Sequence, residues 1–174
     1  MGSPAARIVA LAVCAACGGP PPAPPIANGA PGVADTHSDA ERLIAAVLQR
    51  YLDDPSTMPD HGLLPQAGAV AIAREIRGGG SVTAGAVPAG GRGFAVRGLA
   101  DLQAQADRRG ESVAFIHFTK VEIAADHAVV GVGVDVALPA AAGGVKMCCC
   151  RSYSRYLRRG DGWVFGVEED SICS

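Results

Sequence analysis

The chain has 174 residues, with 15 Lys and Arg against 17 Asp and Glu and a formal net charge of −2. This length favours a single domain that can bury a core without a metal. The balanced charge and an aromatic content of 5% exclude nucleic acid as the expected partner, because that partner needs clustered basic residues and aromatic stacking platforms.

The first seventeen residues have the organisation of an export signal. Arg7 supplies a positive charge, residues 8–16 are apolar throughout, and Cys17 follows. The apolar run is too short for a transmembrane helix, which needs about 20 residues. Ala15-Ala16-Cys17 resembles the end of the lipobox of bacterial lipoproteins, in which the cysteine is acylated. The resemblance implies lipidation at Cys17 and an anchor in the cell envelope, at the periplasmic face or the cell surface.

A second interpretation of the signal stays open, because Cys14 occupies the lipobox position that leucine usually holds. The alternative is ordinary secretion after a small-residue site such as residues 10–12. In both cases residues 1–17 lie outside the folded domain. Residues 18–37 are rich in Pro, Gly and Ala and predict an extended tether. We expect the tether to hold a domain of residues 38–174 away from the membrane.

The strongest helix signal lies at the start of this domain. Ser38 and Glu41 have the spacing of a capping box, and Asp54-Pro55 marks a helix end. Apolar residues recur between them at helical spacing: Leu43, Ile44, Val47, Leu48, Tyr51 and Leu52. This stripe predicts a helix that packs on the core.

The middle of the domain carries weaker signals. Alternating apolar residues favour a strand over a helix within residues 67–77. The Gly-rich stretch 78–93 lacks the spacing of a phosphate-binding loop and predicts a flexible surface loop. Residues 94–97 predict a short strand, and residues 99–108 predict a second helix that ends at Gly110.

The last third of the chain has the pattern of β-hairpins. Residues 112–123 and 127–138 predict one hairpin, and residues 145–158 and 162–169 predict another with its turn at residues 159–162. One long helix followed by an antiparallel meander is typical of an α+β fold.

The end of the chain, with RRGDGWVFG at residues 158–166 and a terminal Ser-x-Cys-Ser, resembles small bacterial lipoproteins with NTF2-like or cystatin-like domains. The resemblance covers residues 38–174. It implies an N-terminal helix packed on a curved antiparallel β-sheet that forms a cone, and it implies no particular activity.

Four cysteines fall in the domain, and the register of the last hairpin decides which of them meet. If residues 161–162 form the turn, Cys173 lies opposite Cys150; if residues 160–161 form it, Cys173 lies opposite Cys148. Because disulfides persist in exported proteins, we expect Cys150–Cys173, with Cys148 as the alternative partner. Both registers place the same residues on one face: Cys148, Cys150, Tyr156, Trp163, Phe165, Val167 and Cys173.

No metal or cofactor is expected. Adjacent strand residues point to opposite faces, so Cys148, Cys149 and Cys150 do not easily hold one ion, and no C-x-x-C spacing occurs. A catalytic cysteine paired with His117 or His127 has no support beyond the presence of both residue types.

His117 and Asp135 lie in the middle of predicted strands among apolar neighbours. They are the candidate catalytic residues if the domain is an enzyme that uses the interior of a cone. The structural interpretation that we favour places His117 on a partly solvated face and Asp135 outward. Gly131 and Gly133, on the same strand face as Asp135, indicate a bulge or the close approach of another element.

The sequence therefore predicts a non-catalytic, envelope-anchored domain that binds a protein, a peptide or a lipid. One alternative is a small NTF2-like enzyme, an isomerase or a hydrolase, that uses His117 and Asp135. Another is an immunity or inhibitor protein of the envelope, which nothing in the sequence separates from the first.

Overall fold

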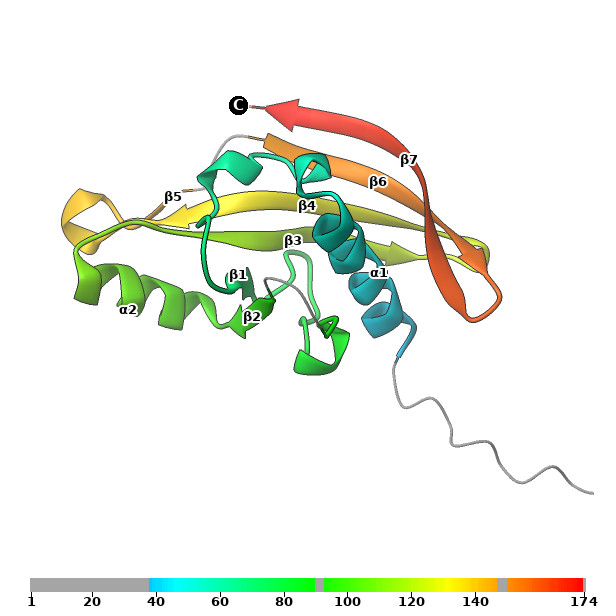
Figure 1. Ribbon diagram of the computed structural model, residues 1–174, viewed down its shortest axis with the longest axis horizontal. Coiled ribbons are helices and arrows are strands. Elements are labelled where there is room, and N and C mark those ends of the chain that lie inside the picture. Colours follow the sequence, from blue (N-terminus) through cyan, green and yellow to red (C-terminus); the bar gives the residue numbers. More distant parts are fainter. Residues whose placement is uncertain (1–37, 90–92, 147–149, 174) are drawn as a thin grey trace, which may run out of the picture. The chain divides into compact units, whose positions relative to one another are not determined.

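A computed structural model describes residues 38–89, 93–146 and 150–173 (Figure 1). The described part is an α+β domain, as expected, and its helices and strands are α1 (Asp39–Asp53), β1 (Val70–Ala73), β2 (Phe94–Arg97), α2 (Leu99–Arg109), β3 (Val113–Ile123), β4 (His127–Ala137), β5 (Val145–Lys146), β6 (Cys150–Arg159) and β7 (Gly162–Cys173). The expected signal segment, the tether and Cys17 lie outside the described residues.

The predicted capping box begins α1. The Ser38 backbone N–H donates to Glu41 Oε2 at 2.8 Å, and the Glu41 N–H donates to Ser38 Oγ at 3.2 Å. These two bonds satisfy donors that the first turn of a helix otherwise leaves unpaired. The helix ends before Asp54, and the predicted apolar stripe is buried apart from the half-buried Leu52.

The sheet is mixed and does not curl up, so the expectation of a wholly antiparallel sheet curved into a cone is wrong. Its strand order is β2-β1-β3-β4-β6-β7, with β5 paired to β4. β1 lies parallel to both β2 and β3, whereas the other pairs are antiparallel. Parallel strands need a long crossover connection. The segment between β1 and β2 in the chain provides the first crossover, and α2 provides the second as the chain returns to the other side of β1 to form β3.

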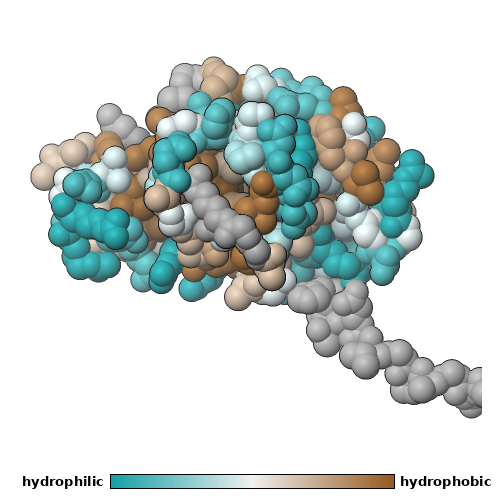
Figure 2. Space-filling view, viewed as in Figure 1, coloured by the Kyte–Doolittle hydropathy of each residue, from teal (hydrophilic) through white to brown (hydrophobic). Residues whose placement is uncertain are grey.

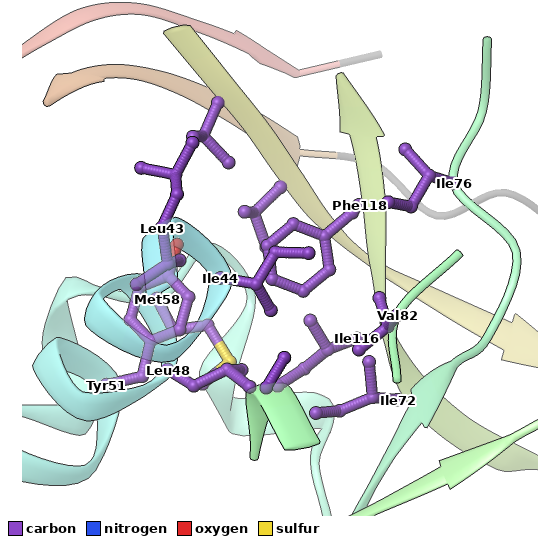
Figure 3. Packing of buried hydrophobic residues seen from close by; sticks show 14 of the residues in the cluster. Leu43, Ile44, Leu48, Tyr51, Met58, Ile72, Ile76, Val82, Ile116 and Phe118 are labelled. Atoms are coloured by element: carbon purple, nitrogen blue, oxygen red, sulfur yellow. The ribbon is translucent and has the colours of Figure 1, made fainter. Parts of the chain in front are cut away.

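The two helices cover opposite faces of the sheet. On the face that we call inner, α1 packs on all the long strands; Figure 3 shows Leu43, Ile44 and Leu48 directed toward side chains of the sheet. On the opposite, outer face, Leu102 and Ala106 of α2 pack only on residues of β1, β3 and β4. The outer face is therefore covered at one end of the sheet.

The Gly-rich stretch is not simply a surface loop, because two of its residues belong to the core. Val82 and Ala86 are 1% and 0% exposed, and Val82 lies beside Ile72 and Ile116 (Figure 3). The Val82 N–H donates to the Arg74 carbonyl oxygen at 2.8 Å, and Glu75 and Ser81 form an antiparallel bridge, so the stretch folds back onto the end of β1. Small residues hid these two core positions from the sequence pattern.

Both expectations for the β4 glycines are met at Gly131. A bulge leaves Thr119 without an opposite residue, between the pairs Phe118–Val132 and Lys120–Gly131. A Cβ at Gly131 would lie 2.5 Å from Thr119 Oγ1 and 2.7 Å from a ring carbon of Tyr153. The missing side chain thus lets neighbouring strands place bulky groups over β4.

Candidate functional site

His117 and Asp135 form a buried pair on the outer face of the sheet. His117 Nδ1 lies 2.8 Å from Asp135 Oδ2, and the two residues are only 6% and 3% exposed. His117 lies opposite Gly133 on β4, and Asp135 is the next β4 residue on the same face. Asp135 does lie on the outer face, but both side chains are buried, so the interpretation that gave His117 a partly solvated position and left Asp135 facing solvent is wrong.

A carboxylate that holds one ring nitrogen of a histidine is a common way to orient an imidazole for proton transfer. Such chemistry also needs a space in which a substrate meets the other nitrogen. Neither side chain lines the pockets formed by described residues that we find in this structure. The geometry of the pair is thus that of a satisfied buried polar group.

The last hairpin joins Cys150 to Cys173 by a disulfide, the expected pairing, but through an unexpected register. Its turn is at Gly160-Asp161, since Arg159 pairs with Gly162. That turn alone would bring Cys173 to Cys148. Two register shifts in β7 move the pairing by two residues, so that Cys173 meets Cys150. Cys148 and Cys149 lie outside the described residues.

The register shifts also change which side chains share a face. Phe165 lies opposite Tyr156 on the inner face, whereas Val167 lies opposite Arg155. Val167 therefore belongs to the outer face, contrary to the sequence-based expectation. Gly166 is passed over at the first shift, and a Cβ there would lie 3.1 Å from the Arg155 carbonyl oxygen.

This arrangement gives the outer face of β6 and β7 a row of exposed apolar side chains, which we call the hairpin patch: Leu157, Val164, Val167 and Ile172. The last three are 54%, 53% and 51% exposed. Only two other large hydrophobic residues of the described chain are exposed, Leu63 and Ile123. Four of the six exposed large apolar side chains therefore lie on one hairpin, and a contiguous exposed apolar patch is typical of an interaction site.

Charged and aromatic residues alternate with the hairpin patch. Tyr153 lies opposite Asp170, and Arg151 lies opposite Ile172. Arg155 Nε donates to Glu169 Oε1 at 2.6 Å. Arg159 follows on the same face at the turn, beside the acidic Asp161, so positive and negative side chains are mixed around the apolar ones. Arginine and tyrosine are the residues that protein–protein interfaces enrich.

The inner side of the same hairpin carries an aromatic groove against α1. Arg50 of α1 stacks over the Phe165 ring at 3.8 Å, and Arg158 stacks over the Trp163 ring at 4.3 Å. Apolar surface lies over this part of β7 beside α1 (Figure 2). Arg158 also binds Asp39 through two nitrogens, at 3.0 and 2.6 Å. Arg158 and Arg42 hold the pKa of Asp39 well below its usual range, at about 2.

Two kinds of site are not formed by the residues that the structure describes. No three His, Cys, Asp or Glu side chains within 38–89, 93–146 and 150–173 come together as metal ligands would. No helix in these ranges has the length and apolar character needed to cross a membrane.

The sequence did not reveal the hairpin patch. The two-residue alternation of a regular strand places Val167 on the same face as Phe165. Gly166, a glycine inside the strand, is the one local signal of a bulge between them. The sequence also does not predict that His117 and Asp135 bind each other, although both lie among apolar residues in the middle of predicted strands.

No family model matches the chain, and comparison with curated proteins and with solved structures gives no match.

Proposed function

We propose that this chain is a non-catalytic, envelope-anchored lipoprotein whose domain binds a protein partner through the hairpin patch. The lipobox-like sequence ending at Cys17 and the Pro-rich tether support the anchor. The position of α1 before long antiparallel strands agrees with the NTF2-like or cystatin-like resemblance, whereas the parallel pairing of β1 departs from the sheet that the resemblance implies. The concentration of four exposed apolar side chains on the outer face of β6 and β7 carries the binding proposal.

The surroundings of the patch favour a protein over an anionic membrane surface. Binding to anionic lipid needs an excess of Lys and Arg, each contributing about 1 kcal/mol near the surface. Here Arg151, Arg155 and Arg159 lie among Asp161, Glu169 and Asp170, and Glu169 already binds Arg155. An apolar centre with balanced charges suits a folded protein that carries a complementary patch.

The partner is expected to dock on the face of the hairpin and not on its edge. β7 is the last strand of the sheet, so its edge is available for strand pairing. Two register shifts and the acidic run 168–170 interrupt that edge. Bulges and charges of this kind are how natural sheets prevent edge-to-edge pairing.

An enzyme that uses His117 and Asp135 is less well supported, since both side chains are buried against each other. An inhibitor or immunity protein would use the same patch, and its target would then be the partner. The two versions of a binding role differ in what the partner does, and both need the patch.

The anchor is tested by the intact mass of the mature protein isolated from native envelopes. A chain that begins at Cys17 with two or three added acyl groups supports the proposal. A chain that begins elsewhere and carries no lipid makes the protein a secreted one.

The binding surface is tested by photo-crosslinking in the native host. A photoreactive residue replaces Val167 in the patch or, as a matched control, the exposed Arg108 at the far end of α2. We expect a discrete protein adduct from position 167 only, and its loss when Val164→Asp is added. Adducts of equal yield from both positions, or adducts with lipid alone, would contradict the proposal.

A further inference from the structure

A mostly apolar pocket of about 230 Å³ lies between the end of α1 and the beginnings of β1 and β2. We call it the α1–β2 pocket. Its apolar wall includes Tyr51, Met58, Leu64, Val70 and Phe94. The first four are buried and belong to the main core, so the fold itself sets the shape of this wall. The pocket is well separated in sequence from the hairpin patch.

The volume of the pocket limits what it can hold. An apolar cavity of about 150 Å³ in another protein binds benzene, whereas pockets for drug-sized molecules begin near 300 Å³. A cavity of this size therefore accommodates one ring with a small substituent. The rings of Tyr51 and Phe94 and the thioether of Met58 favour an aromatic guest, through edge-to-face and sulfur–aromatic contacts.

Two exposed polar side chains, His61 and Gln66, also line the pocket. Their imidazole and amide groups can exchange hydrogen bonds with one polar group of a ligand. A pocket with an apolar wall and few polar groups is the usual form of a small-molecule site.

The turn that carries His61 is fixed from a distant strand. Asp60 has a left-handed backbone, with φ of 50°, and is the only such non-glycine residue in the described chain. Its carboxylate Oδ2 accepts a hydrogen bond from the Cys150 N–H at 2.8 Å. A strained residue held by a long-range bond is characteristic of binding sites, where it presets the position of a neighbour. The neighbour here is His61.

We propose that the α1–β2 pocket binds a small aromatic molecule with one polar substituent. The ring lies among Tyr51, Met58 and Phe94, and the substituent bonds to His61. This site is independent of the proposed protein-binding patch, since the two share no residue.

The test uses the full chain with Cys17→Ser, so that no lipid or detergent competes for the pocket. Phenol and benzene are titrated while methyl NMR signals of Met58, Leu64 and Val70 are followed. We expect both probes to shift these signals and phenol to bind more tightly. His61→Ala should weaken phenol about threefold to tenfold, the effect of one hydrogen bond, and leave benzene unchanged.

A pair of matched variants locates the binding. Leu52→Phe enlarges a half-buried residue of the pocket wall, whereas Leu63→Phe makes the same change at an exposed residue that does not line this pocket. We expect only Leu52→Phe to abolish the shifts, with the fold of each variant verified by its amide spectrum. Absence of shifts up to the solubility limit of both probes would overturn the proposal. So would equal loss in the two variants, or phenol and benzene affinities that are equal and insensitive to His61→Ala.

Discussion

The two long hairpins of the sheet are stabilised in different ways. β3 and β4 lie in the middle of the sheet, with α1 on the inner face and α2 on part of the outer face. β6 and β7 pack on α1 with their inner face, and in the described part of the chain no helix packs on their outer face. This second hairpin is instead fastened at both ends, by the Cys150–Cys173 disulfide and by the Arg158–Asp39 ion pair near the turn.

The two hairpins show how a sheet can keep part of one face free. Burial on both faces fixes the part of β3 and β4 beneath α2 through packing, which leaves little surface there for a partner. Covalent and ionic contacts at the ends of β6 and β7 fix the hairpin while Val164 and Val167 stay exposed. Variants that remove either a packing contact of β3 and β4 or an end contact of β6 and β7 therefore test whether the two hairpins are stabilised in these different ways.

The largest effect is expected in the buried hairpin. His117→Leu leaves the Asp135 carboxylate buried without its partner, and we expect a loss of about 3–5 kcal/mol in the free energy of unfolding. The double variant His117→Leu/Asp135→Leu removes both polar groups and should regain most of that loss. Urea denaturation measures both values. A double variant no more stable than the single one would show that the pair is itself a net source of stability.

The disulfide comes next. Cys173→Ser under oxidising conditions should lower the free energy of unfolding by about 2–4 kcal/mol, because the unfolded chain gains the freedom of an opened loop. Reduction of the wild-type protein should produce a similar loss, which the variant should not show. If the variant is as stable as the oxidised wild type, the hairpin does not depend on its covalent end.

Gly131→Ala should cost about 1–3 kcal/mol, since its Cβ would meet Thr119 Oγ1 and the Tyr153 ring at 2.5 and 2.7 Å. Gly133→Ala is the matched control on the same strand face. Its nearest neighbours, Arg151 Cγ at 3.1 Å and the Cys150 carbonyl oxygen at 3.3 Å, lie further away than those at Gly131, so we expect a smaller loss. Thermal unfolding distinguishes the two variants, and equal losses would mean that the close approach at Gly131 is unimportant.

The smallest effect concerns the ionic end of the hairpin. The pKa of Asp39 is lowered from 3.8 to about 2 by Arg158 and Arg42, so the folded protein prefers the charged form. This contribution is complete above the unfolded pKa and is lost as the pH falls toward 2. Between pH 5 and about pH 2, the wild type should therefore lose more stability than Asp39→Asn. Parallel pH profiles for the two proteins would contradict this role of the ion pair.

The sequence was sufficient for elements whose signals are local. The capping box at Ser38 and Glu41, the apolar stripe of α1 and the turn at residues 159–162 each depend on close neighbours in the chain. Parallel pairing of β1 was not predictable, because it depends on a crossover through α2. The register shifts in β7 were also hidden, and they decide both the disulfide partner and the face on which Val167 lies.

The α1–β2 pocket was hidden for a similar reason. It is assembled from the end of α1, the turns that follow and two strand beginnings, none of which carries a motif. The hydrogen bond between Asp60 and Cys150 joins residues 90 positions apart, and neither residue type predicts it. Local sequence patterns identify helices and hairpins. The hairpin patch and the α1–β2 pocket depend instead on bulges and long-range polar contacts, which such patterns do not show.

A binding role for the hairpin patch requires that its side chains form a free surface and are not part of the core. The direct test compares one substitution at both kinds of position by urea denaturation of the full chain with Cys17→Ser. Val132→Thr on the inner face of β4 buries a hydroxyl among apolar residues and should cost about 1–3 kcal/mol. Val164→Thr/Val167→Thr should change stability by no more than about 0.5 kcal/mol per site. A loss per site as large as that of Val132→Thr would place the patch in the core and contradict its assignment as a binding surface.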